Sequence, residues 1–134
     1  MVDSFRSITT TLVAAVVALI FSGALVHGHE QALAEQGKRL FFRCAACHSL
    51  SAEGPAMFGP HLEDIVGRTA GTVAHFEYTD SELRAQAFVW DEEYFEEWLQ
   101  HPQAKYPQMC VPFRGLTDPE ARRALFVFLR NPIP

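Results

Sequence analysis

The sequence predicts a small all-α domain, with three main helices and long loops wrapped around a bound group. Its 134 residues suffice for one domain and little more. Helical periodicity recurs in separate segments, whereas residues 49–73 are rich in glycine and proline and show no strand alternation. Because such loops bury little apolar surface, we expect something large and apolar to lie inside them.

The first expected helix covers residues 32–43. Leu33, Gly37, Leu40 and Phe41 recur at the spacing of one helix face. Glycine lowers helix propensity, so Gly37 on this face indicates that another helix crosses closely there.

Capping residues mark the later helices. Asp91 precedes EEYFEEWLQ, which Pro102 should end. The last helix opens at Thr117-Asp118-Pro119-Glu120, a capping-box spacing with proline in the first turn, and ends at Asn131-Pro132. A short further helix should begin at Thr79-Asp80. The apolar face of the last helix consists of Ala121, Leu125, Phe128 and Leu129.

The N-terminus has the pattern of an export leader. Residues 11–26 carry no charge, Arg6 precedes them, and small residues and a polar segment follow. A cleaved signal peptide and a retained membrane anchor both fit this pattern. We therefore expect a leader or anchor over residues 1–28 and a domain over 29–134. That domain should lie in the periplasm or on the outer face of the cytoplasmic membrane.

The charge of the chain excludes one class of partner. Its formal net charge is −5, and lysine occurs only at Lys38 and Lys105. No basic stripe is present to neutralise phosphates, so nucleic acid is not an expected partner. The 3 cysteines are too few for a disulfide scaffold.

Cys44-Ala45-Ala46-Cys47-His48 is the segment that carries chemistry. Two thiols at this spacing can each add across a vinyl group of one porphyrin, and the histidine that follows can bind the iron. A thioredoxin-like dithiol would need a βαβ pattern, and half of a zinc site would need further ligands at close spacing; the sequence shows neither. The motif therefore predicts one covalent haem.

From about Gly37 to Leu129 the chain resembles class I c-type cytochromes of the mitochondrial and alphaproteobacterial kind. The resemblance rests on ordered blocks: GKRLFFRCAACHSL, GPHLEDIVGRTAG, FEYTD, FVWDEEYFEEWLQHP, YP…PFRGL and EARRALFVFL. It implies one haem c on Cys44 and Cys47, with iron bound by His48. It also implies that the first and last helices cross at Gly37, Phe41, Leu125 and Phe128.

The resemblance implies further roles around the haem. The carbonyl of Pro60 should accept the Nδ1–H of the iron-binding histidine. Arg68, Tyr78 and Trp90 should reach the haem propionates. The remaining haem-contacting positions are Trp98, Leu99 and Phe113.

The second axial ligand departs from the family pattern. These cytochromes use a methionine in a loop Tyr-x-Pro-Gly-x-Lys-Met-x-Phe, and that position is Val111 here. Valine cannot bind iron, so we expect the ligand to be Met109, with Cys110 as the alternative. Position 109 lies two residues before Val111 and faces the same way in an extended segment, and a neutral thioether suits an electron carrier.

The resemblance implies a single-haem, one-electron carrier that exchanges electrons with redox proteins and is not an enzyme. We expect a monomer, with a membrane tether if the leader is retained. Mitochondrial-type members dock through a lysine rim that this chain lacks. The alternative is a haem-based sensor or ligand-binding protein, in which the sixth position is open or held by Cys110.

Overall fold

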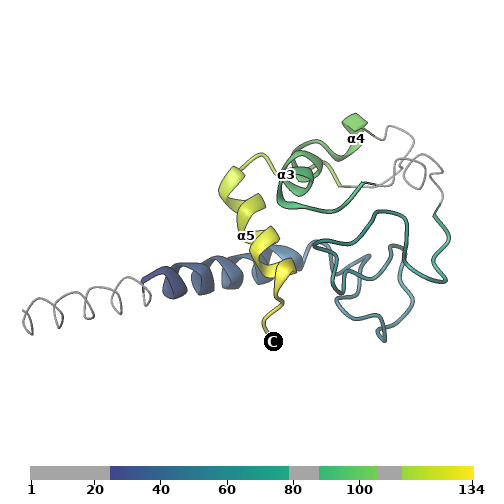
Figure 1. The fold of residues 1–134 in the computed structure, drawn as a ribbon, viewed down its shortest axis with the longest axis horizontal. Coiled ribbons are helices and arrows are strands. Elements are labelled where there is room, and N and C mark those ends of the chain that lie inside the picture. The colour runs from purple at the N-terminus through teal and green to yellow at the C-terminus, as the bar shows by residue number, and fades with distance from the viewer. Residues whose placement is uncertain (1–24, 79–87, 106–112) are drawn as a thin grey trace, which may run out of the picture. The chain divides into compact units, whose positions relative to one another are not determined.

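The computed structural model describes residues 25–78, 88–105 and 113–134 (Figure 1). The chain divides into two compact units, Met1–Ala32 and Leu33–Pro134. The described part of the first unit, 25–32, is helical. Within the described ranges, no helix combines the length and the apolar character needed to cross a membrane.

The described ranges are helical, with long connecting loops. A helix covers residues 25–41, and α3 (Glu92–Gln100), α4 (Pro102–Lys105) and α5 (Pro119–Arg130) follow (Figure 1). The described residues contain no strand, only an isolated antiparallel bridge between Thr69 and Val89. The prediction of an all-α chain with long loops is confirmed.

The helix 25–41 and α5 touch closely at Gly37. A Cβ on this glycine would lie 2.1 Å from the carbonyl oxygen of Ala124 and 2.6 Å from Cβ of Phe128. One turn further on, the rings of Phe41 and Phe128 lie 5.6 Å apart. Only glycine lets the two backbones come this near, so the close crossing predicted at Gly37 is confirmed.

Local side-chain caps begin α3 and α5. The Asp91 carboxylate accepts a hydrogen bond of 2.8 Å from the backbone N–H of Tyr94. The cap of α5 is Asp118, which accepts from the Glu120 N–H at 3.0 Å, one residue after the Thr117 at which the capping-box spacing begins. Both caps satisfy N–H groups that the helix leaves without a partner.

The core lies between α5 and its neighbours. Almost every residue of α5 from Ala121 to Leu129 is buried, not just the predicted face. Phe126 packs against Phe95 of α3, with ring centroids 5.6 Å apart. A helix buried on most sides is a central element, and α5 therefore holds the rest of the domain together.

Three helix boundaries differ from expectation or lie outside the described ranges. The first helix already covers residue 25, well before residue 32. Pro102 ends the preceding helix as expected but also begins the short α4, because proline suits a first helical turn. The short helix expected from Thr79-Asp80 lies outside the described residues.

Candidate haem-binding site

The two motif cysteines lie on a tight turn that continues the first helix. The Cys44 N–H donates to the Phe41 carbonyl at 2.7 Å, and the Cys47 and His48 N–H groups donate to the Cys44 carbonyl at 3.0 and 2.9 Å. Both cysteines are free thiols and half-buried. The turn therefore presents two unpaired sulfurs and an imidazole within five consecutive residues.

The environment of Cys44 argues against a dithiol oxidoreductase. Burial raises the pKa of the Cys44 thiol above its ordinary value; nearby Arg43 opposes this shift and Cys47 adds to it. Catalytic cysteines in C-x-x-C motifs have a lowered pKa, because the thiolate is the attacking form. The raised pKa of the Cys44 thiol is the opposite of what disulfide exchange requires.

His48 is prepared to bind a metal through Nε2. Its Nδ1 lies 2.7 Å from the carbonyl oxygen of Pro60. A carbonyl only accepts, so Nδ1 must carry the proton, and Nε2 keeps a lone pair. Burial lowers the pKa of His48, although the hydrogen bond to Pro60 partly opposes this. Burial thus favours the neutral imidazole, which is the form that binds metals.

Gly59 lies directly against the His48 ring. From the sequence alone, no role was assigned to this residue. A Cβ on this residue would lie 2.3 Å from Cε1 of His48. Two backbone hydrogen bonds of 2.8 Å, from Gly59 to the Cys47 carbonyl and from Leu62 to the Ser49 carbonyl, hold this loop in place. The one signal in the sequence was a Gly-Pro pair following the cysteine motif.

Replacing Gly59 with alanine should displace the His48 ring. The added methyl group has no room, and overpacking of this kind costs about 1–3 kcal/mol. We expect a lower melting temperature and a change in the haem absorption bands. Gly67→Asn is the control, because a Cβ at Gly67 meets nothing within 4 Å and asparagine tolerates its φ of +86°. Equal spectra for both variants would contradict this role of Gly59.

Three of the predicted haem-contacting residues pack around the buried Ala70, and a fourth, Arg68, is joined to one of them through the backbone. Backbone hydrogen bonds join two loop segments here: Trp90 donates to the Arg68 carbonyl at 3.0 Å, and Ala70 donates to the Phe88 carbonyl at 2.8 Å. Ala70 is 2% exposed and packs against Tyr78, Phe88, Trp90 and Trp98. The structure therefore brings Arg68, Tyr78, Trp90 and Trp98 together from three separate segments.

Several polar groups in this region have hydrogen-bonding capacity to spare. The half-buried Arg68 donates to the carbonyls of His61 and Glu63 at 2.8 Å each, and burial lowers the pKa of its guanidinium. The Tyr78 hydroxyl accepts from the Val73 N–H at 3.2 Å and retains its own proton to donate. Trp98 Nε1 is buried without a partner. Buried donors require acceptors, so these groups fit a ligand that carries carboxylates.

The apolar positions lie in or against the main core. Leu99 is 3% exposed, and Trp98 and Phe113 stack with ring centroids 6.0 Å apart. Cys44 packs on the edge of the same core cluster. Met109, Cys110 and Val111 lie outside the described residues, so the identity of the sixth ligand stays a prediction.

A covalently attached haem fits this site. The site offers two neighbouring free thiols, an imidazole with a lone pair on Nε2, the aromatic residues around Ala70, and polar groups with hydrogen bonds left to donate. This set of residues on an all-α fold defines a c-type cytochrome. The chain belongs to the cytochrome c family, whose model matches residues 34–131.

Individual relatives agree with the family. The chain is 37% identical over 105 residues to cytochrome c of Cochliobolus lunatus, and the match covers 78% of this chain and 96% of that relative. It is 32% identical to a cytochrome c homolog of Rickettsia typhi, where the match covers 73% of this chain but only 55% of the relative. It is 31% identical to cytochrome c2 of Blastochloris viridis, covering 73% and 76% of the two chains.

Membership in the family confirms two of the predictions from the sequence. The fold is the small all-α cytochrome c fold, and the cofactor is covalent haem c with its iron. The protein is accordingly a haem-based electron carrier with redox proteins as its partners.

Proposed function

We propose that this protein carries single electrons between redox proteins outside the cytoplasm and catalyses no reaction of its own. The observation that carries the proposal is the fixed position of His48, which is hydrogen-bonded to Pro60 and lies directly against Gly59. When bound, the haem iron supplies a reversible change between ferric and ferrous states. A ligand held in one orientation keeps structural change between these states small, which favours rapid transfer.

The residues of the chain then have distinct tasks. Cys44 and Cys47 would tether the porphyrin, and Nε2 of the neutral His48 would bind its iron. The spare donors of Arg68 and Tyr78 are available to neutralise propionate charge. The indole N–H of Trp90 has the same role through the family resemblance. Trp98, Leu99 and Phe113 supply apolar contacts that exclude water.

A redox titration followed by absorption tests this function. An electron carrier should titrate reversibly as one species with a one-electron slope, and its spectrum should return after repeated cycles. Steady turnover of an added substrate such as peroxide, with drift of the spectrum, would contradict the proposal.

The location and organisation belong to the same proposal. Residues 1–28 act as an export leader or membrane anchor, and residues 29–134 form a monomeric haem domain in the periplasm or on the outer membrane face. The uncharged run 11–26 supports this, as does the family match that begins at residue 34. The mass of the purified chain distinguishes the two forms, because cleavage removes the first 28 residues and retention keeps them.

Met109 should be the sixth ligand rather than Cys110. With methionine on the iron, Cys110→Ala leaves the ferric spectrum and the near-infrared sulfur-to-iron charge-transfer band unchanged, whereas Met109→Ala abolishes that band. If Cys110→Ala instead raises the potential and alters the ferric spectrum, the thiolate is the ligand, because a thiolate stabilises ferric iron.

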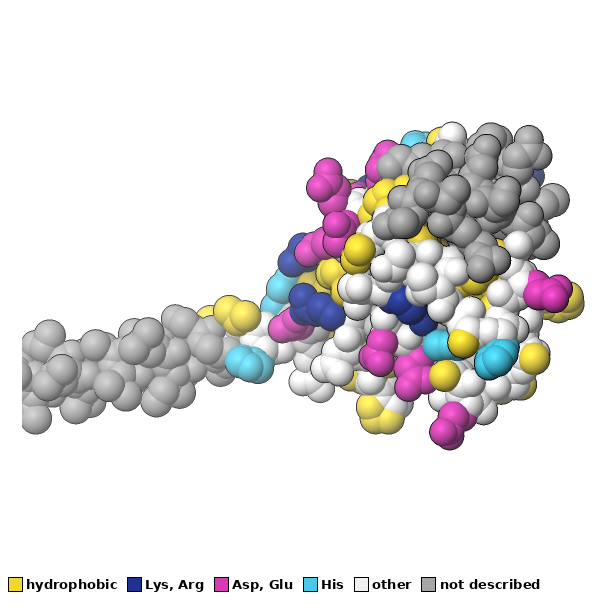
Figure 2. Space-filling model, turned by 45° about the vertical axis from the view of Figure 1, so that its right-hand side comes forward, with side chains coloured by type: hydrophobic (Ala, Val, Ile, Leu, Met, Phe, Trp, Pro, Cys, Tyr) yellow, Lys and Arg dark blue, Asp and Glu magenta, His cyan; other side chains and the backbone are white. Residues whose placement is uncertain are grey.

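Docking should depend little on salt. On the face drawn in Figure 2, the Lys and Arg side chains of the described residues lie as separate spots among acidic ones. With a net charge of −5 there is no lysine rim to attract acidic partners. Electron transfer to such a partner, measured by stopped flow at rising ionic strength, should be slow throughout. A steep fall in rate with salt would contradict this expectation.

A sensor function remains the second candidate because Val111 occupies the position where the family has its axial methionine. An open or weakly held sixth position would let a small ligand reach the iron. Binding of carbon monoxide distinguishes the two functions.

A further inference from the structure

We propose that Arg122 is a positioning residue that holds residues 113–116 in place and thereby keeps the sixth ligand on the iron. The inference rests on the proposed function, in which Met109 is the sixth ligand. Residues 113–116 follow that part of the chain directly. Arg122 lies in α5, and its hydrogen-bond partners are Glu96 and Leu116 rather than Cys44, Cys47 or His48, so we expect its effect to pass through this segment.

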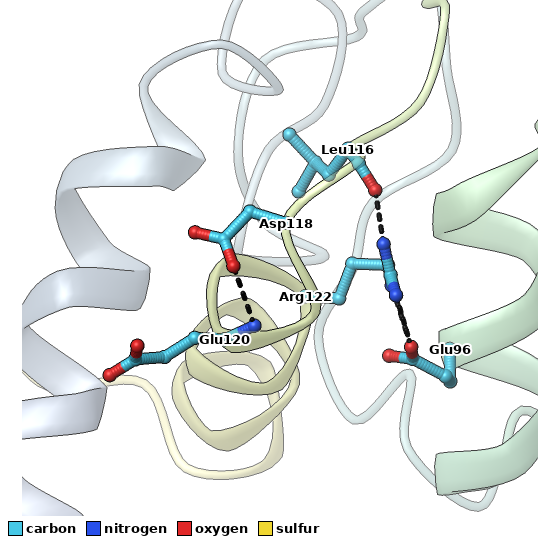
Figure 3. Close-up of polar contacts among 5 residues, drawn as sticks. All are labelled: Glu96, Leu116, Asp118, Glu120 and Arg122. Atoms are coloured by element: carbon cyan, nitrogen blue, oxygen red, sulfur yellow. Dashed lines mark hydrogen bonds and ion pairs between the residues drawn. The ribbon is translucent and has the colours of Figure 1, made fainter.

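Among the described residues, Arg122 is the one charged residue that is buried, with 4% of its surface exposed. Its Nη1 donates to the carbonyl oxygen of Leu116 at 2.5 Å, while Nε and Nη2 both face Oε1 of Glu96 at 2.7 and 2.5 Å. Figure 3 shows the guanidinium between these two partners. The hydrogen bond to Glu96 raises the pKa of Arg122 further, so the group stays charged. One side chain thus joins α5, α3 and the segment that contains Leu116.

The same segment is fixed to α3 through its backbone. The Leu116 N–H donates to the Leu99 carbonyl at 2.7 Å, so both backbone groups of Leu116 are bonded. Gly115 has a φ of +95°, and a Cβ there would lie 2.3 Å from the Gln100 carbonyl oxygen. The backbone therefore lies directly against the end of α3, in a conformation that favours glycine.

A buried ion pair is weak evidence for stability, because desolvation offsets much of its attraction. Apolar residues of similar volume would often serve as well for packing alone. What they would lack is a donor for the Leu116 carbonyl, which the arginine fork supplies in a defined direction. We therefore assign the Arg122–Leu116 hydrogen bond to placement of this segment, and the Arg122–Glu96 pair to orientation of the guanidinium.

The chain offers matched variants for a test. Arg122→Met removes both contacts, and Glu96→Gln removes the ion pair but leaves the donor for Leu116. Arg123→Met is the control, because Arg123 pairs with Glu92 at 3.0 Å and joins the same two helices through exposed side chains. Arg122→Lys keeps a charge but lacks the fork, so it replaces Arg122→Met if the latter does not fold.

The readouts are the rate of imidazole binding to the ferric holoprotein and the near-infrared sulfur band, alongside the melting temperature. Loss of a buried hydrogen bond should raise the imidazole rate about tenfold in Arg122→Met and weaken the band. Arg122→Lys should change both in the same direction. Arg123→Met should bind imidazole at nearly the wild-type rate. Glu96→Gln should do the same, because the amide oxygen of glutamine can still accept from Arg122 and orient the guanidinium.

Two other outcomes overturn the inference and can be told apart. If Arg122→Met lowers the melting temperature but binds imidazole at the rate of Arg123→Met, Arg122 is merely structural and the proposed function is unaffected. If the wild type itself lacks the sulfur band and binds imidazole without delay, the loop supplies no sulfur ligand. In that case the proposed axial ligand fails together with the role of Arg122.

Discussion

Replacing Cys44 and Cys47 together with alanine should yield a chain that carries no covalent haem. Both sulfurs are unpaired and lie on one turn, and no other described cysteine can replace them. A domain of this size with such long loops also depends on the haem for much of its core, so the variant should lose cooperative unfolding. Intact mass after acid–acetone extraction measures the first effect, and thermal unfolding followed by circular dichroism measures the second.

The single variants and a third cysteine supply the controls. Each single replacement should leave at most one thioether bond, whereas Cys110→Ala should keep the full haem mass. A double variant that still carries the mass of one haem after extraction would contradict attachment at Cys44 and Cys47.

Replacing Gly37 with valine should have the largest effect on stability among substitutions outside the haem site. The first added carbon would lie 2.1 Å from the backbone oxygen of Ala124, and backbone cannot move aside as a flexible side chain can. Separating two packed helices should cost about 3 kcal/mol or more. For a domain of about 100 residues this corresponds to a fall in melting temperature of about 12 °C or more.

Arg39→Val is the matched control for this variant. Arg39 is exposed on the same helix, so its replacement introduces the same β-branched side chain without a steric conflict. If the holoproteins of Gly37→Val and Arg39→Val unfold at the same temperature, the close crossing does not hold in solution.

Short sequence patterns, such as helix caps and the cysteine motif, correctly predicted the local structure around them. Asp91 and Asp118 precede helices that they cap, and the cysteine motif lies on a turn that follows a helix. Gly37 was predictable for a different reason. An unfavourable glycine on an apolar helix face has few explanations other than a close neighbour.

Long-range contacts were harder to predict because no periodicity encodes them. The contact of Gly59 with the His48 ring, and the pairing of Arg122 with Glu96 at a separation of 26 residues, both join different segments of the chain. An arginine on an otherwise amphipathic helix is usually solvated, so its sequence gives no sign of burial. The choice between Met109 and Cys110 depends on the path of the loop, which neighbouring residue types do not determine.

Mixing the reduced holoprotein with carbon monoxide tests the central claim most directly. An electron carrier whose iron is held by His48 on one side and by a loop sulfur on the other should keep its absorption spectrum unchanged. A prompt shift of the spectrum to that of a carbon monoxide complex would show an open sixth position. That result would contradict the carrier account and favour a ligand-binding haem protein.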